Sequence, residues 1–341
     1  MPVYDRLVGA LSRVSECVAL DLRRVQEALG DLRDVNLYHL RTEVPDVPDV
    51  AASDSSRVTK SYSMAVVFAV QAVGLRVSHA RPSSSGLVAE AEAGYYLPSP
   101  WAGDAAGELL RRVLQYVSKT LEVSVLAEAS EGAEVALLDG SIFSFLWYWR
   151  SRLREIPGSL RFSGDRPRRL RDIWREIVSG LARLPKAGTV PVFVAKTIMR
   201  SYYVGRLLGG EASSRLGGRV NDLVLLYALR ACGRLPRGVY ILEPVHISSI
   251  HEMPRPLNAL DPEDSRYLEP LVPVTVTYVS LSPAAQLYQV TLPGKWSAEE
   301  LVELLSRLYP YSHGGYPDPL RLAHRYSKLS SEEFRYLLLR L

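Results

Sequence analysis

A short apolar run that stops abruptly at an aspartate constrains the fold more than any other stretch of the chain. Residues 135–138 are all apolar and are followed directly by Asp139-Gly140-Ser141. An apolar run of this length, closed by a turn signal, is typical of a buried β-strand. In open α/β sheets, ligands bind beyond the carboxyl ends of such strands. The stretch therefore predicts an α/β domain with a carboxylate at the mouth of a buried strand.

Two further acidic residues fit the same pattern. Residues 46–56 predict an earlier buried strand in which Asp54 precedes two serines. Residues 105–129 predict a long helix, and Glu122 lies on the flank of its apolar stripe, where it can reach the buried layer. Because Mg²⁺ and Mn²⁺ prefer oxygen ligands, three converging carboxylates would suit a catalytic metal site. The chain has 37 acidic residues, however, so spacing alone also allows helix caps and surface turns.

The rest of the chain alternates between strand and helix patterns. A mixed order of this kind, after a leading meander, indicates an α/β domain with a mixed sheet. We expect an amphipathic N-terminal helix and connector over residues 1–45 and a single domain over residues 46–341. Expected strands are 63–74, one beginning at 75–79, 189–195, 239–242, 272–279 and 286–292; expected helices are 4–29, 142–153, 170–184, one from 219, 297–308, 317–327 and 331–339. Asp222 is expected to be a helix-start acid and not a further metal ligand.

Composition excludes several classes of protein. The formal net charge is only +4. Of the 41 basic residues, however, only six are lysine and the rest are arginine, and arginine suits phosphate contacts. The same bias also follows from genomic base composition or a high growth temperature. Cys17 and Cys232 form no zinc motif or disulfide framework. No stretch reads as a signal peptide or a membrane span, so a cytoplasmic protein without a membrane partner is expected.

Taken together, the motifs resemble those of the NurA nuclease family, archaeal DNA end-processing enzymes that work with the hexameric ATPase HerA. The motifs are Asp54-Ser55-Ser56-Arg57, Glu122, Leu137-Leu138-Asp139-Gly140-Ser141, the strand ending at Lys196, and the stretch from Gly315 to His324. The resemblance implies an RNase H-like core related to Argonaute nuclease domains, a mixed sheet flanked by helices, and a homodimer. It also implies a Mn²⁺-dependent active site, with Mg²⁺ as the other candidate cofactor.

The resemblance also assigns roles to residues. Asp54, Glu122, Asp139 and His324 would bind metal, and Tyr316 and Lys196 would complete the catalytic set. From the residues alone, His324 is equally a helix-surface histidine, Tyr316 a core aromatic and Lys196 a strand-end cation. The DNA contacts are expected at Arg57 and at the basic loop of residues 161–171, above all Arg166, Arg168 and Arg169. A groove collecting the arginines of that loop, Arg161 and Arg171 included, would make binding depend on salt.

The implied activity is hydrolysis of DNA phosphodiesters, as a single-strand endonuclease and 5′ to 3′ exonuclease. Its substrates would be single strands and duplex ends, processed with HerA during double-strand-break repair by homologous recombination. One departure favours an alternative, a non-catalytic DNA-binding or adaptor subunit. Ser55 stands where the family usually has glycine, and serine is strained there if the turn needs a positive φ. A hydrolase of small phosphate esters is a third possibility, which the absence of a Gly-rich phosphate loop disfavours.

Overall fold

The protein is built on one mixed sheet. The computed structural model describes residues 35–78, 86–98, 105–147, 156, 158–164, 169–196, 201–207, 220–283 and 286–339, together with Val8, Ser12 and Arg23. Strands follow the order β1-β8-β10-β11-β7-β5-β2-β3-β4-β6, and β9 pairs with β10. The central strands β2, β5 and β7 pair in parallel, and the flanking pairs are antiparallel. Apart from those three residues, the expected helix at 4–29 lies outside the described residues.

The strands are longest at the β2–β3 hairpin. Their bounds are β1 Leu37–His39, β2 Val50–Ser61, β3 Val66–Val77, β4 Val88–Tyr96, β5 Val135–Asp139, β6 Leu160–Phe162, β7 Val190–Ala195, β8 Tyr240–Leu242, β9 Val245–Ile247, β10 Val274–Ser280 and β11 Leu287–Pro293. The α-helices are α2 Ala105–Ala129, α3 Ile142–Phe145, α4 Leu170–Lys186, α5 Tyr202–Leu207, α7 Asp222–Ala231, α8 Pro262–Leu268, α9 Ala298–Leu308, α10 Asp318–Ser327 and α11 Ser331–Leu338. Short 3₁₀ turns are η2 Ile250–Glu252, η3 Leu257–Ala259, η4 Glu269–Leu271, η5 Tyr309–Tyr311 and η6 His313–Gly315. In the described part of the chain, no helix has the length and apolar character needed to cross a membrane.

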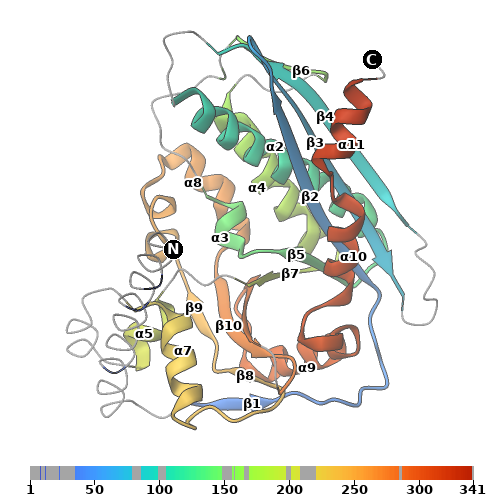
Figure 1. Cartoon of the computed structure of the whole chain (residues 1–341). Coiled ribbons are helices and arrows are strands. Elements are labelled where there is room, and N and C mark those ends of the chain that lie inside the picture. The colour runs from blue at the N-terminus through green and yellow to red at the C-terminus, as the bar shows by residue number, and fades with distance from the viewer. Residues whose placement is uncertain are drawn as a thin grey trace.

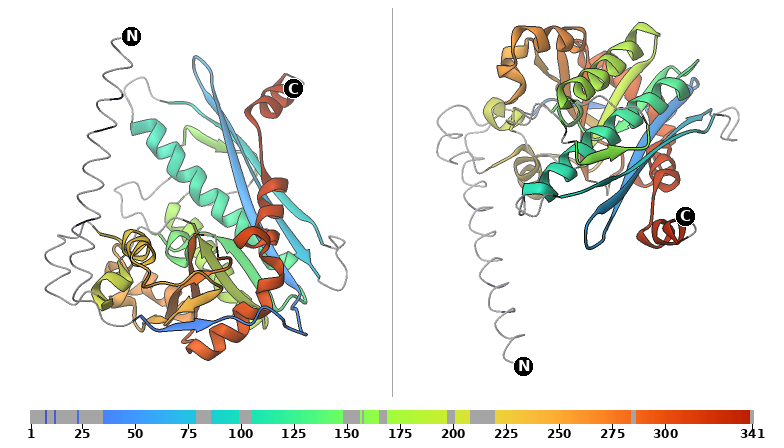
Figure 2. Two further views of the ribbon diagram at one scale, coloured as in Figure 1. Left: turned by 60° about the horizontal axis from the view of Figure 1, so that its bottom comes forward. Right: turned by 90° about the horizontal axis from the view of Figure 1, so that it is seen from above.

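Helices cover both faces of this sheet (Figure 1). Helices α2 and α4 pack on one face, whereas α9 and α10 pack on the other. Viewed from above, α2 and α10 lie on opposite sides of the β2–β4 strands (Figure 2). Successive side chains of a strand point to opposite faces, so Ala51 joins the α2 core while Val50 and Ala52 join the α10 core. This alternation places Asp54 on the α10 side and Ser55 on the α2 side.

The first predicted strand is displaced and longer than expected. Strand β2 begins at Val50 and runs through Asp54 to Ser61, so Asp54 lies within the strand and not at its end. The parallel pairing with β5 stops at Ser53 opposite Leu138, and from Asp54 onward β2 pairs with β3 alone. Asp54 therefore still lies at the point where the central sheet opens, which is the environment that the sequence predicted for it.

The meander after β2 also differs from the prediction. Residues 66–77 form one continuous strand, where a break near residue 75 was expected. The third strand is β4 at residues 88–96, which the sequence analysis missed because its Ala-Glu alternation lacks the β-branched residues typical of strands. Gly74 lets α2 approach β3, because a Cβ there would collide with the Val125 carbonyl. The expected helix over residues 105–129 is confirmed in full.

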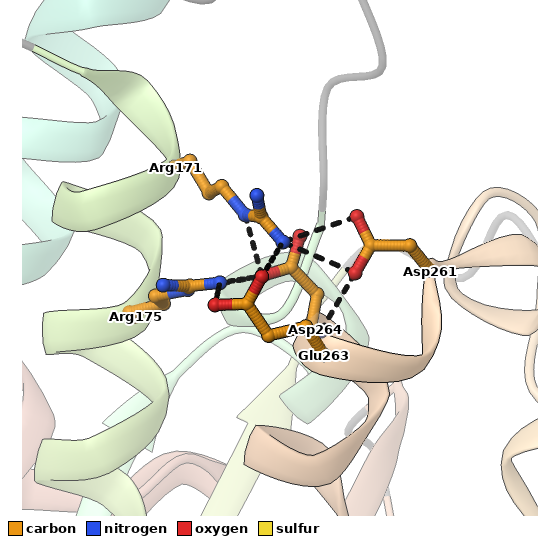
Figure 3. Close-up of polar contacts among 5 residues, drawn as sticks. All are labelled: Arg171, Arg175, Asp261, Glu263 and Asp264. Atoms are coloured by element: carbon orange, nitrogen blue, oxygen red, sulfur yellow. Dashed lines mark hydrogen bonds and ion pairs between the residues drawn. The ribbon is translucent and has the colours of Figure 1, made fainter.

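An ion-pair cluster joins α4 to α8 (Figure 3). Arg171 Nε and Arg175 Nη2 both lie 2.8 Å from Asp264 Oδ1, and the Asp264 side chain is fully buried. Arg175 Nη2 also lies 2.7 Å from Glu263 Oε1. Arg171 therefore serves the fold, and its expected place in a DNA-binding groove stays a prediction. A buried carboxylate is stable only when its charge is compensated, so these two arginines hold α8 in place.

We expect Arg175→Ala to lower the free energy of unfolding by about 2 kcal/mol, because Asp264 would keep only one of its two cations. Urea denaturation followed by circular dichroism measures this value. The matched control is Arg266→Ala, an exposed arginine on α8, which should change stability by less than about 0.5 kcal/mol. Equal effects of the two substitutions would mean that the cluster does not hold α8.

Candidate active site

Three carboxylates meet where the parallel part of the sheet ends. Asp54 comes from β2, Asp139 is the last residue of β5, and Glu122 comes from α2. The β2–β5 register pairs Ser53 with Leu138, which brings the next residue of each strand to neighbouring positions. The charges of Asp54 and Asp139 both act on Glu122, so the three groups share one electrostatic environment. The structure thus brings together the three acids that the sequence predicted.

Asp54 is held by residues of α10. His324 Nδ1 lies 2.7 Å from Asp54 Oδ2, and the same oxygen accepts a hydrogen bond from Ser327 Oγ at 3.2 Å. His324 and Ser327 are three residues apart, which puts them on one face of the helix. His324 is largely exposed, whereas Ser327 is fully buried. The helix that ends the family motif thereby orients the carboxylate of the first motif.

Asp139 faces a lysine and a tyrosine. Lys196 Nζ donates to Asp139 Oδ2 at 2.7 Å and lies 4.2 Å from the centre of the Tyr316 ring. Burial, and then the nearby Asp139 charge, raise the pKa of Tyr316, so its phenol stays protonated. Gly140 turns the chain directly after Asp139 with φ +117°, a conformation that other residues rarely adopt. These contacts place both Lys196 and Tyr316 at the predicted site.

Glu122 is the most buried of the three acids. Its side chain is 2% exposed, and Ser55 Oγ donates to Oε2 at 2.9 Å. Lys119 Nζ lies 3.7 Å from the same oxygen, while Oε1 is buried without a hydrogen-bond partner among the described residues. Burial raises the pKa of Glu122 to about 7, and the charges of Asp54 and Asp139 add to this effect. A buried, partnerless carboxylate oxygen beside two other acids is a position that favours a cation.

The donor set fits a hard divalent cation, although its oxygens do not already surround one point. Within the described ranges, no group of three or more His, Cys, Asp or Glu side chains is arranged to hold a metal ion. In this arrangement His324 and Ser327 contact Asp54, and Lys196 contacts Asp139. The positive charge of Lys196 offsets the charge of Asp139. The oxygen-rich donors, together with an Oε1 of Glu122 that lacks a partner in the described part of the chain, agree with Mg²⁺ or Mn²⁺ chemistry.

The predicted DNA-contacting arginines are placed only in part. Arg57 lies on β2, three residues beyond Asp54, and its side chain is exposed. Desolvation of its guanidinium, and then the charge of Arg111, lower the pKa of Arg57, so two cations lie close together there. Arg169 is exposed at the N-terminal end of α4. Arg166 and Arg168 lie outside the described residues.

The structure bears on the predictions for Ser55 and Asp222. Ser55 has no strained backbone, because every described residue with a positive φ is a glycine. The observation that favoured a non-catalytic subunit therefore disappears. Asp222 begins α7 as expected, but its buried carboxylate accepts from the backbone of Tyr203 and Val204 and from the Tyr278 hydroxyl. It caps α5 and is not a ligand at this site.

The sequence did not indicate three contacts to the acids, those of Ser55 and Lys119 with Glu122 and of Ser327 with Asp54. Each of these three residues lies close in sequence to a residue that was singled out. Lys119 and Ser327 are each three residues from a predicted site residue on the same helix, a spacing that puts side chains on one face. Ser55 neighbours Asp54 but points to the other side of the sheet, toward Glu122. Helical spacing was thus a usable signal for two of the three.

The chain is similar to known proteins both in its sequence family and in its fold. The family model of the NurA domain matches residues 48–329. The NurA nuclease from Sulfolobus solfataricus superimposes with a TM-score of 0.68 at 15% identity, covering 99% of this chain and 95% of that chain. A NurA structure with manganese has a TM-score of 0.56 at 14% identity and 98% and 97% coverage. A NurA structure bound to dAMP and manganese has a TM-score of 0.53 at 14% identity and 98% and 94% coverage.

A search of curated proteins finds no match. At these identities the structural likeness shows a shared fold, the helix-flanked mixed sheet of RNase H-like type that the family resemblance implied. The family model spans most of the chain and includes Asp54, Glu122, Asp139, Lys196, Tyr316 and His324. The chain therefore belongs to the NurA family of nucleases.

Proposed function

We propose that the chain hydrolyses DNA phosphodiesters and that Asp54, Glu122 and Asp139 hold Mn²⁺, or Mg²⁺, for this reaction. The observation that carries the proposal is the meeting of these acids where β2 and β5 part, with one buried oxygen of Glu122 that has no partner among the described residues. The NurA structures with manganese and with dAMP and manganese support both the cofactor and the nucleotide substrate.

The residues around the acids have separable roles in this proposal. A bound divalent cation supplies positive charge to the phosphate and lowers the pKa of a coordinated water. Lys196 carries a positive charge beside Asp139 and can neutralise a phosphate oxygen. His324 orients Asp54, or joins the ligand set, and can exchange a proton at its exposed ring. Protonated Tyr316 can donate a hydrogen bond to a charged oxygen.

More specifically, we propose that the chain acts as a single-strand endonuclease and a 5′ to 3′ exonuclease. It would do so together with a HerA-type ATPase in the resection of DNA ends. The direct test is cleavage of labelled single strands and duplexes in Mn²⁺, Mg²⁺ or EDTA, with and without the ATPase. Cutting that requires a divalent cation supports the nuclease. Cutting that persists in EDTA, or none in any mixture, contradicts it. Labels at either end distinguish the two exonuclease polarities, and a circular single strand isolates the endonuclease.

We also infer that the chain forms a homodimer. The exposed face of β4 is the surface that supports this inference. Alternate residues of this strand and its flanks are apolar and exposed: Leu87, Ala89, Ala91, Ala93, Tyr95 and Leu97. A solvated face of an antiparallel sheet normally carries polar side chains, and contiguous apolar patches mark interaction sites. Leu337 on α11 and Leu339, directly after this helix, are 55% and 77% exposed. A two-fold pairing would let each copy supply both apolar surfaces.

The double substitution Tyr95→Glu and Leu97→Glu is expected to convert a dimer into a monomer, because four carboxylates would have to be buried in the contact. Light scattering during gel filtration measures the mass. The control is Tyr227→Glu, an exposed tyrosine on α7 that is 49% exposed. A wild-type monomer would contradict the homodimer itself. A dimer that tolerates the double substitution would contradict only the β4 surface.

A further inference from the structure

The two oxygens of Glu122 have different surroundings. Oε2 accepts from Ser55 Oγ at 2.9 Å and lies 3.7 Å from Lys119 Nζ. Oε1 is buried and has no hydrogen-bond partner among the described residues. The hydrogen bond and the ion pair therefore both act on Oε2 and leave Oε1 available. This asymmetry fixes the plane of the carboxylate instead of letting it rotate between equivalent positions.

Both donors are themselves fixed. Ser55 is part of the β2–β3 ladder, opposite Ala72, and its side chain points to the α2 face of the sheet. Lys119 lies on α2, one turn before Glu122, with its Nζ 3.5 Å from the centre of the Phe145 ring. Its side chain is only 19% exposed. A cation held over an aromatic face and against a carboxylate has little freedom to leave. Neither donor belongs to the set of metal-binding acids proposed above.

We propose that Ser55 and Lys119 are positioning residues that anchor Oε2 of Glu122 and thereby present Oε1 to the divalent cation. This inference rests on the proposed metal-dependent function. Partners that orient metal ligands without touching the metal commonly contribute 10- to 100-fold to metal affinity. An alanine or a glycine at position 55 lacks the hydroxyl donor, whereas a threonine keeps it. Methionine at position 119 keeps the length of the side chain and loses its charge.

The test is Mn²⁺ affinity, measured by calorimetry at one fixed pH without DNA. Ser55→Ala and Lys119→Met are each expected to weaken Mn²⁺ binding about tenfold. Ser55→Thr should restore wild-type affinity, and the exposed-site control Ser63→Ala should not change it. In cleavage assays, the half-saturating Mn²⁺ concentration should rise by the same factor, while the rate at saturating Mn²⁺ stays within about twofold of wild type.

The outcomes separate this inference from the proposed function. Wild-type affinity in both Ser55→Ala and Lys119→Met would overturn the positioning role and leave the nuclease proposal intact. A loss in Ser55→Ala that Ser55→Thr does not restore would also overturn it for Ser55. A wild-type protein that binds no Mn²⁺ and cuts no DNA would instead overturn the proposed function. Melting temperatures of the variants identify any loss that results from unfolding.

Discussion

Replacing either Asp54 or Asp139 with asparagine is expected to lower the rate of DNA cleavage on the order of a thousandfold, which corresponds to about 4 kcal/mol of transition-state stabilisation. The substitution keeps the size of each side chain and removes one negative charge from the proposed metal site. In Asp139→Asn, Lys196 also loses its 2.7 Å charged partner. Single-turnover cleavage of a labelled single strand at saturating Mn²⁺ measures the rate.

The control for this prediction is Asp172→Asn, an acid on α4 outside the three-carboxylate site. Its cleavage rate should equal that of the wild type, and all three variants should bind DNA without metal as the wild type does. Retention of more than a tenth of the wild-type rate by both active-site variants would place the chemistry elsewhere. A loss of rate in Asp172→Asn as well would point to a general effect of charge.

Glu122→Gln is expected to abolish cleavage and yet stabilise the metal-free protein. The pKa of Glu122 is raised from an ordinary 4.5 to about 7, so the folded protein holds a proton that the unfolded chain releases. The stability contributed by this proton is complete below pH 4.5 and is lost as the pH rises to about 7. Above pH 7 the wild type should therefore be less stable than the glutamine variant by on the order of 3 kcal/mol.

Chemical denaturation of both proteins between pH 4 and pH 8, in EDTA, measures the difference in the free energy of unfolding. The difference should grow from near zero at about pH 4.5 and level off above about pH 7. Added Mn²⁺ should stabilise the wild type and leave the variant unchanged, because a ligand stabilises the state that binds it. If the free energy of unfolding of the two proteins depended on pH in the same way, ionisation of the buried Glu122 would not lower the stability of the fold, which would contradict the prediction.

The sequence predicted the centre of the sheet better than its edges. The β5 run and the 105–129 helix have strong local signals, namely a short apolar segment before Asp-Gly and a long 3.6-residue period, so both were predicted at the observed bounds. Strand β4 has no such signal. Its Ala-Glu alternation reads as solvated, and its strand structure depends on pairing with β3 and β6. Tertiary pairing therefore overrides local preference there.

In the candidate site, too, only the residues near a strong local pattern could be predicted. Asp54, Glu122 and Asp139 could be named because each is near an apolar pattern that indicates its depth in the fold. The partners of these acids could not be named from pattern alone, since the contact of Asp54 with His324 joins residues 270 positions apart. The resemblance to a family supplied that link. The contacts of Ser55 and Lys119 with Glu122 came from neither source, and only the geometry revealed them.

The most direct test of the proposed metal site is a crystal structure of the protein grown with Mn²⁺, with diffraction data collected at the manganese absorption edge. We expect an anomalous peak within coordination distance of Asp54, Glu122 and Asp139, with Glu122 bound through Oε1 and Lys196 moved away from Asp139. A peak bound only by other residues, or the Lys196–Asp139 pair intact at saturating Mn²⁺ with no peak, would contradict it.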